Sequence, residues 1–332
     1  MNLKKIKPSY DTERHELGKI LPLKTPFNII IDSSERCNFK CKYCFRSSDE
    51  KSEWGYAKRN DLMEWETFER IVSQIMKFPE QVRQISLSNH GEPLCNPLLP
   101  QMVKYIKKCG ITSRVSIHTN AFQLTGNMLD ELAVSNIDRV VISLQGLSDD
   151  KYKKMCNVNV NFQLLRDNIE MFYKKQSRTN VFIKIMDTAL ADENERNLFY
   201  KTFEPIADRV FIEKEVPIWK GIEKGNEQVI YNKYGDEFPK QKCCPLIFHT
   251  IVIAPNGEIY PCTQLLREDI LGNVYDTTLK EVWDGDERKQ LLISQCKMTN
   301  PKICENCYIL QNSIYSKKDM IDDYRNEILS RI

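Results

Sequence analysis

Three cysteines close together are the strongest chemical signal in the sequence. Cys37, Cys41 and Cys44 have C-x3-C-x2-C spacing and follow an apolar run at 29–31. Three sulfurs this close can surround one small inorganic core. A structural zinc site, however, is tetrahedral with four ligands, and a 4Fe–4S cube has four iron corners. The triad therefore needs either a distant protein ligand or a fourth ligand that is not protein.

Four further cysteines form a second set near the C-terminus: Cys244, Cys262, Cys304 and Cys307. Asn-Gly at 256–257, between two apolar runs, predicts a β-hairpin that has Cys244 at its entrance and Cys262 at its exit. Four thiols suit either a zinc ion or an iron–sulfur cluster without an open corner. Cys243 is an alternative to Cys244 as the first ligand. We interpret the remaining cysteines as small buried side chains: Cys95, Cys109, Cys156, Cys243 and Cys296.

The composition is that of a soluble enzyme, with 41% hydrophobic and 28% charged residues among 332. The net charge of +2 gives no electrostatic signature of nucleic-acid binding. We find no signal peptide and no apolar run of about 18 residues that could span a membrane. We therefore expect a cytoplasmic protein without nucleic-acid or membrane partners. In a reducing cytosol, twelve cysteines indicate metal or redox chemistry rather than disulfides.

Short apolar strands alternate with amphipathic helices through the first two thirds of the chain. We predict strands at 27–32, 84–89, 114–119, 139–144, 181–186 and 210–213. We predict helices at 62–77, 98–109, 126–135, 162–175 and 193–203, the first capped by Asp61. This alternation predicts an α/β fold, an incomplete parallel (β/α)6 barrel with the helices outside. The cysteine triad follows the first strand, at the C-terminal mouth where α/β barrels place active sites.

The pattern changes near residue 215, where an irregular stretch begins. Beyond it we predict the hairpin, with strands at 248–254 and 258–260, and helices at 278–293 and 317–332. We divide the chain into a lead-in at 1–26, a partial barrel at 27–214, a linker or lid at 215–240, a small β-hairpin and helix cluster domain at 241–310 and a C-terminal helix at 311–332.

The cysteine triad, with the aromatic Tyr43 before its last cysteine, resembles the signature of the radical S-adenosylmethionine (SAM) superfamily. The resemblance implies a 4Fe–4S cluster held by Cys37, Cys41 and Cys44, with SAM bound at the fourth iron and Tyr43 beside this cofactor. In that family, reductive cleavage of SAM gives a 5′-deoxyadenosyl radical that abstracts a hydrogen atom from the substrate.

Other residues at the strand mouths resemble the SAM contacts of this family. Gly91-Glu92-Pro93 matches the GGEP segment that contacts the SAM amino group, although His90 replaces the usual first glycine. Asn120, after the third strand, and Ser143, late in the fourth, stand where the family places ribose and carboxylate contacts. The alternative for each is an ordinary structural role, as a turn or as a strand-end cap.

The second cysteine set resembles the auxiliary-cluster extension called SPASM, in its short "twitch" form. The G-x4-C and C-x2-C spacings of that extension occur at 257–262 and 304–307, and no cysteine follows Cys307, unlike in the full extension. The resemblance implies one auxiliary 4Fe–4S cluster with four thiolate ligands. We prefer Cys244 to Cys243 because the family usually has Cys-Pro here, and Pro245 follows Cys244.

A cluster with four thiolate ligands cannot bind substrate, but it can accept the second electron of a two-electron oxidation. This arrangement resembles 2-deoxy-scyllo-inosamine dehydrogenase-like enzymes. The resemblance implies a radical SAM oxidoreductase that oxidises an alcohol on an amino sugar, cyclitol or nucleotide sugar, with a flavodoxin- or ferredoxin-type reductant. Candidates for binding or deprotonating the substrate are His118, Lys184, Asp187, Glu213 and, in the lid, Trp219. Each could instead be a satisfied core or strand-end residue.

Two alternative functions remain open. A peptide-modifying enzyme, such as an epimerase or a crosslinking enzyme acting on a ribosomal precursor peptide, commonly has a recognition domain of about 80 residues. The lead-in at 1–26 is too short for one, but that domain can be a separate protein. A non-enzymatic zinc or iron–sulfur binding protein is disfavoured, because the triad lies at the mouth of a βα core.

Overall fold

The structure is a computed structural model that describes residues 14–47, 60–217, 231–264, 270–299, 304, 307–312 and 314–332. Some sequence-based expectations lie outside the described residues. They concern Trp219, residues 1–13 of the lead-in and residues 218–230 of the linker or lid.

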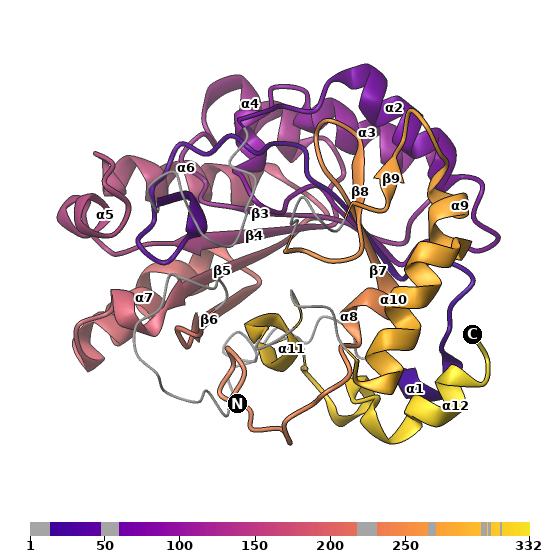
Figure 1. The fold of residues 1–332 in the computed structure, drawn as a ribbon. Helices are drawn as coiled ribbons and strands as arrows, with labels where there is room; N and C mark the ends of the chain where they lie inside the picture. The colour runs from indigo at the N-terminus through magenta and orange to yellow at the C-terminus, as the bar shows by residue number, and fades with distance from the viewer. Residues whose placement is uncertain are drawn as a thin grey trace.

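Within the described ranges, nine strands form one open, curved sheet in the order β6-β5-β4-β3-β2-β1-β7-β8-β9 (Figure 1). The first six strands pair in parallel with their neighbours. Their bounds are β1 Asn28–Ile31, β2 Gln84–Ser86, β3 Val115–Thr119, β4 Arg139–Leu144, β5 Asn180–Met186 and β6 Arg209–Glu213. The predicted α/β fold with an incomplete parallel barrel is confirmed.

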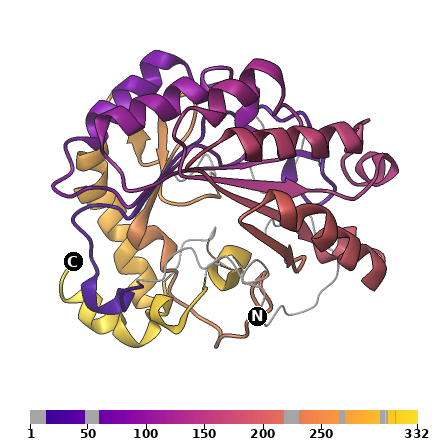
Figure 2. The same ribbon diagram turned by 180° about the vertical axis from the view of Figure 1, so that it is seen from behind.

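Helices cover the outer face of the parallel strands (Figures 1 and 2). They are α2 Trp65–Ile75, α3 Leu99–Cys109, α4 Gly126–Ala133, α5 Asp149–Cys156, α6 Phe162–Lys175 and α7 Glu193–Phe203. Their apolar faces and the outward side chains of the strands form the main hydrophobic core. We did not predict α5, because Tyr152 and Cys156 are the only two of its eight residues that are buried.

The remaining strands extend the barrel sheet beyond β1. They are β7 Thr250–Ile253, β8 Glu258–Tyr260 and β9 Gly272–Asn273. β7 pairs in parallel with β1, with Ile29 opposite Ile251, and β8 returns antiparallel to β7. Gly257 has a φ of +85° in the intervening turn, which confirms the predicted hairpin. The first strand of the hairpin starts at Thr250 rather than at residue 248, because a short helix, α8 Leu246–His249, precedes it.

Two predicted helix boundaries were wrong for local reasons. α2 begins at Trp65 and is not capped by Asp61, because Leu62 instead forms an antiparallel bridge with Ser34. The helix predicted at 278–293 is two helices, α9 Leu279–Asp284 and α10 Asp286–Lys297. Gly285 separates them because its backbone is extended, with a ψ of 158°.

The C-terminal segment consists of short pieces rather than one long helix. It contains 3-10 turns at Lys317–Asp319 and Asp322–Tyr324, followed by α12 Arg325–Leu329. Two other short helices are α1 Leu17–Ile20 and α11 Tyr308–Asn312. None of the helices in the described ranges has the length and apolarity that a membrane crossing requires.

Arg288 of α10 joins the C-terminal helices to the start of β7. Its guanidinium donates to the carbonyl oxygens of Trp283 at 2.9 Å, Ile247 at 3.1 Å and Phe248 at 3.4 Å. It also lies over the Trp283 ring, 3.4 Å from the centroid. Burial lowers the pKa of Arg288 to about 9, so the cation occupies this position at a cost that its hydrogen bonds offset.

We predict that Arg288→Met destabilises the protein by about 2–4 kcal/mol, because three buried carbonyl oxygens lose a charged donor. The measurement is the thermal unfolding midpoint of anaerobically purified protein. Lys297→Met is the matched control, because it removes the same charge from an exposed site on α10. Equal midpoints for the two variants would contradict this role of Arg288.

Candidate functional site

The cysteine loop after β1 rests on the carboxyl end of α5. The backbone N–H of Lys40 donates to Cys156 O and that of Lys42 donates to Met155 O, both at 3.0 Å. The thiols of Cys41 and Cys156 lie 3.5 Å apart. The helix that we did not predict therefore supports the loop that carries the triad.

The three thiols of the triad lie near one another and are protonated in the absence of a metal. Burial raises the pKa of Cys37 to about 12 and that of Cys44 to about 11, and the neighbouring Cys41 adds to both shifts. The hydrogen bond with Cys156, together with burial, raises the pKa of Cys41. Thiolate is the form that binds metals, and a soft iron–sulfur core fits three sulfurs in this setting.

Gly91 is required because the chain after β2 passes directly over the start of the cysteine loop. A Cβ atom at this position would lie 2.0 Å from Ser34 O and 2.7 Å from Arg36 O, both backbone oxygens. The next residue, Glu92, donates its backbone N–H to Arg36 O at 2.8 Å. This close approach fixes the Gly91-Glu92 segment against the cysteine loop.

Glu92 organises the residues expected to contact SAM. Its buried carboxylate accepts from the backbone N–H of Leu94 at 3.1 Å, the hydroxyl of Thr119 at 2.5 Å and the backbone N–H of Asn120 at 2.7 Å. Burial raises the pKa of Glu92 to about 7, against the effect of these donors. Asn120 in turn donates to Asn38 Oδ1 at 2.8 Å, which joins β3 to the cysteine loop.

Tyr43 and Ser143 are connected through Gln145, which lies just past β4. The Tyr43 hydroxyl donates to Gln145 Oε1, and Gln145 Nε2 donates to the backbone oxygen of Ser143 at 3.1 Å. Sequence reasoning missed Asn38 and Gln145. Their only signal was their position, inside the cysteine loop and directly after a strand.

Buried polar atoms around this loop fit a polar cofactor such as SAM. In the described part of the chain, Asp32 Oδ1, Asn38 Nδ2 and Asn89 Nδ2 are buried without a hydrogen-bond partner. Such atoms are costly unless a ligand or water satisfies them. All three follow β1 or β2, at the mouth where the triad lies.

We predict that Gly91→Ala lowers 5′-deoxyadenosine formation from SAM at least tenfold. The added methyl group cannot lie 2.0 Å from Ser34 O, so the segment must move away from the cysteine loop. Product is measured by chromatography after anaerobic incubation with SAM and dithionite. Gly110→Ala is the control, because no atom lies within 4 Å of its Cβ position, so any effect there comes from its own φ of +64° and not from a close contact. Wild-type product formation in Gly91→Ala would show that this contact is dispensable.

Three of the four predicted catalytic residues come together on the concave face of the sheet. The Lys184 ammonium on β5 lies 2.6 Å from the Glu213 carboxylate on β6. Lys233 binds the other oxygen of Glu213 at 2.8 Å. Burial, followed by the charges of Lys184 and Lys233, lowers the pKa of His118 on β3 to about 3. Burial acts to raise the pKa of Glu213, but the two lysines outweigh it and lower that pKa to about 2.

Asp187 was predicted as a catalytic candidate, and that role stays a prediction. Its carboxylate accepts from the backbone N–H groups of Thr188 and Glu215, each at 2.9 Å, and so ties the chain after β6 to the 3-10 turn Asp187–Ala189. Lys233 was missed because it lies in the stretch at 215–240, which has no periodic pattern. Its backbone oxygen accepts from Lys214 N–H at 2.8 Å, which holds it beside β6.

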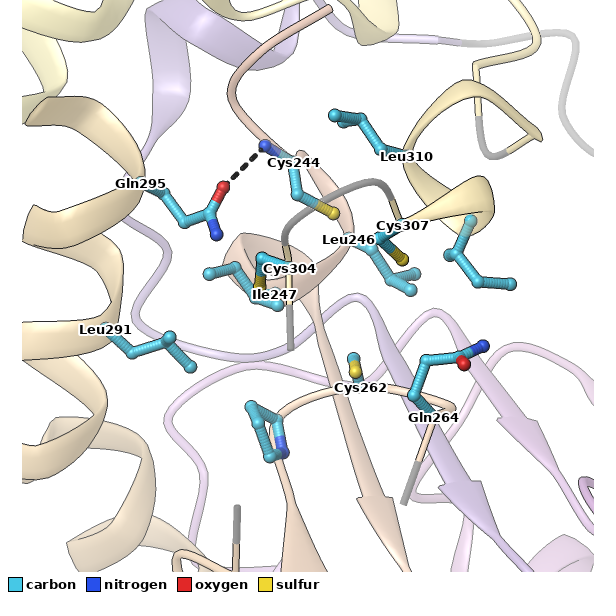
Figure 3. Close-up of a pocket in the computed structure, with 12 residues that line it drawn as sticks. Cys244, Leu246, Ile247, Cys262, Gln264, Leu291, Gln295, Cys304, Cys307 and Leu310 are labelled. Atoms are coloured by element: carbon cyan, nitrogen blue, oxygen red, sulfur yellow. Dashed lines mark hydrogen bonds between the residues drawn. The ribbon is translucent and has the colours of Figure 1, made fainter. Parts of the chain in front are cut away.

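The second cysteine set lines one cavity (Figure 3). The other lining residues are mostly apolar: Leu246, Ile247, Pro261, Gln264, Leu291, Gln295, Ile309 and Leu310. Burial raises the pKa of Cys244 to about 12, and Cys307 and Cys304 add to this shift. Burial also raises the pKa of Cys262 far above its usual value. Four thiols and no other soft ligand in the lining fit a thiolate-bound cluster.

Two further contacts favour Cys244 over Cys243 as a ligand. Cys243 is fully buried in a hydrophobic cluster with Phe248, and its thiol hydrogen-bonds Cys296. The Cys244 N–H donates to Gln295 Oε1 at 3.0 Å (Figure 3). Gln295 is 1% exposed, and its Nε2 has no partner among the described residues, so the cavity offers a donor suited to a cluster sulfur.

Comparison with protein families identifies both cysteine sites. The Radical SAM superfamily matches residues 31–197, which include the triad and four complete parallel strands, β2 to β5. The chain belongs to the radical SAM superfamily. The SPASM iron-sulfur cluster-binding domain matches residues 243–308, which include all four cysteines of the second set. The protein therefore uses SAM with a 4Fe–4S cluster and has an auxiliary iron–sulfur site.

A curated relative matches this chain nearly end to end. It is the tungsten-containing aldehyde ferredoxin oxidoreductase cofactor-modifying protein of Pyrococcus furiosus, 25% identical over 90% of this chain and 92% of the relative. A GTP 3′,8-cyclase of Clostridium perfringens is 28% identical over 58% of this chain and 56% of its own length. The match to the cyclase thus spans little more than half of that enzyme.

Solved structures share the fold at low sequence identity. BtrN in complex with AdoMet and 2-DOIA has a TM-score of 0.55 and 16% identity, over 88% of this chain and 97% of BtrN. Native anSMEcpe with bound AdoMet and Cp18Cys peptide has a TM-score of 0.58 and 16% identity, over 92% of this chain and 95% of anSMEcpe.

We predict that the double variant Cys304→Ala, Cys307→Ala halves the iron content and abolishes substrate turnover, while SAM cleavage without substrate persists. Anaerobic wild-type protein should contain about eight irons, four in each cluster. Iron is measured by colorimetric assay per mole of protein. Cys109→Ala is the control, because Cys109 ends α3 outside both cysteine sets. An unchanged iron content in the double variant would rule out these residues as ligands.

Proposed function

We propose that the protein is a radical SAM oxidoreductase that oxidises an alcohol on a small, hydroxyl-rich molecule such as an amino sugar, cyclitol or nucleotide sugar. When bound, the cofactors supply a 5′-deoxyadenosyl radical that takes one hydrogen atom and an auxiliary cluster that takes the second electron. The observation that carries the proposal is that four cysteines line the same cavity. Four thiolates leave no iron corner for substrate, so electron transfer is the chemistry available there.

The ionisable residues on the concave face of the sheet support an alcohol as the reacting group of the substrate. We call these residues the concave group: His118, Lys184, Glu213 and Lys233. His118 is neutral at pH 7, because burial and the nearby lysines lower its pKa to about 3, so one ring nitrogen has a lone pair. In the proposed reaction this nitrogen accepts a hydrogen bond from the substrate hydroxyl. A pKa of about 3 makes the ring too weak a base to hold the proton, which leaves to solvent. Lys184 and Lys233, both held by Glu213, donate to the substrate oxygens. The substrate loses one hydrogen atom, one electron and one proton, which balances the conversion of an alcohol to a ketone.

The relatives support a small molecule and also define the main rival. The Pyrococcus furiosus protein is named for modification of a cofactor, and the BtrN structure holds 2-DOIA. The anSMEcpe structure holds a peptide, so modification of a peptide is the second candidate. The charged concave group favours the first candidate, because an ion pair this buried suits a substrate that forms many hydrogen bonds.

The test uses reconstituted enzyme with SAM, dithionite and a panel of cyclitols, amino sugars, nucleotide sugars and short peptides. A small molecule that loses two mass units, with deuterium transfer from its carbinol carbon into 5′-deoxyadenosine, would support the proposal. Modification of a peptide alone would overturn it.

We predict that Glu213→Gln lowers kcat/KM for this oxidation at least tenfold and leaves SAM cleavage without substrate within twofold of wild type. Loss of the carboxylate leaves two partly buried ammonium groups without their counter-charge. Glu193→Gln, at an exposed position in the first turn of α7, is the matched control. Equal kcat/KM for the two variants would remove Glu213 from the substrate site.

A further inference from the structure

His90 contacts one residue beside each cysteine site. Its ring lies 4.9 Å from that of Phe45, the residue after Cys44, in an edge-on contact with an interplanar angle of 63°. Its Nε2 lies 2.6 Å from the backbone oxygen of Thr263, the residue after Cys262. The His90 side chain thus connects Phe45, which follows the proposed ligand Cys44, to Thr263, which follows the proposed ligand Cys262.

The tautomer of His90 follows from this geometry. A carbonyl oxygen can only accept, so Nε2 carries the hydrogen and donates it to Thr263. The side chain is buried, with 6% of the residue exposed, so solvent does not compete for this bond. Burial lowers the pKa of His90 to about 3, so the ring is neutral at pH 7.

The backbone of His90 is held as firmly as its ring. Its N–H donates to Asp32 Oδ2 at 3.1 Å, which ties the residue to the end of β1. The adjacent Gly91 lies against the carbonyl oxygens of Ser34 and Arg36. The histidine therefore projects from a fixed point beside the triad, and its ring reaches the segment that leaves β8.

We propose that His90 is a positioning residue that fastens the auxiliary site to the SAM site and provides the electronic contact between them. The path starts at Cys44 and follows the chain to Phe45, whose ring contacts the His90 ring. It continues through the hydrogen bond from His90 to Thr263 O and follows the chain to Cys262. One electron passes along this path from the reduced auxiliary site to the oxidised SAM site, and no bond is made or broken. The electronic part rests on the proposed function, whereas the fastening part does not. A glycine at position 90 could make neither contact.

Four substitutions separate the two contacts. His90→Gly removes both. His90→Phe keeps an aromatic ring against Phe45 and loses the donor to Thr263. His90→Gln keeps a donor of similar reach and loses the ring. His249→Gln is the control, because His249 is a partly buried histidine that hydrogen-bonds Asn28 and Thr250 instead.

Two measurements on the two-cluster protein apply, and neither needs substrate. Hydrogen exchange reports the amides of residues 262–264. Flash photoreduction followed by freeze-quench EPR reports how fast one electron redistributes between the clusters.

Losing one hydrogen bond, about 1 kcal/mol, speeds local hydrogen exchange roughly fivefold. We expect this increase in His90→Gly and His90→Phe, together with at least fivefold slower redistribution. We expect exchange in His90→Gln to stay within twofold of wild type, because a donor to Thr263 remains. We expect redistribution in this variant to be at least fivefold slower, because the ring contact with Phe45 is lost.

The outcomes separate the parts of the proposal. Wild-type exchange and redistribution in both His90→Gly and His90→Phe would overturn it entirely. Faster exchange with unchanged redistribution would overturn the electronic contact. If His90→Gly cannot hold both clusters, the comparison of His90→Phe with His90→Gln still decides. Failure of wild-type enzyme to oxidise any substrate would overturn the proposed function without affecting these results.

Discussion

The parallel pairing of β7 with β1 is the constraint on which the rest of the structure depends. β1 is hydrogen-bonded to β2 on one side and to β7 on the other, and Asp32 N–H continues the ladder to Ile253 O at 2.8 Å. The cysteine triad follows the end of β1, whereas Cys244 precedes β7. Because the two strands are parallel, the triad begins beyond their C-terminal ends and the second set begins before their N-terminal ends. β1 and β7 have four residues each, which corresponds to a length of about 13 Å.

Backbone contacts and side-chain packing together hold the cysteine loop in place, and Phe39 of the loop is buried against Tyr152 of α5 and Phe122. The carboxyl end of α5 accepts from two loop amides, and the chain at Gly91 passes within van der Waals distance of the loop carbonyls. Glu92 then joins this segment to β3 through Thr119 and Asn120. Backbone contacts of this kind tolerate changes in the outer side chains, but they do not tolerate a Cβ at residue 91.

The sequence was a good guide to the strands and a weaker guide to the parts that depend on distant contacts. Each parallel strand is a short apolar run with a polar end, and all six were found within a few residues. Helix α5 was not found, because its exposed Lys153 and Lys154 hide the two residues that are buried. Lys233 could not be found, because only tertiary structure brings it to Glu213. The catalytic role of Asp187 stays a prediction, because a carboxylate at a strand mouth has the same sequence signal whether it binds substrate or caps a turn.

The burial of the cysteine thiols links cluster assembly to protons. Cys37, Cys44 and Cys244 have pKa values of about 12, 11 and 12, so each is protonated at neutral pH until metal arrives. Each of these ligands must then release a proton as the cluster forms. For the triad, Cys37 and Cys44 alone make the apparent cluster affinity rise about a hundredfold for each unit increase in pH. An ordinary thiol is also protonated at pH 7, so burial does not create this proton release but extends it to more alkaline pH, up to about pH 11 for Cys44.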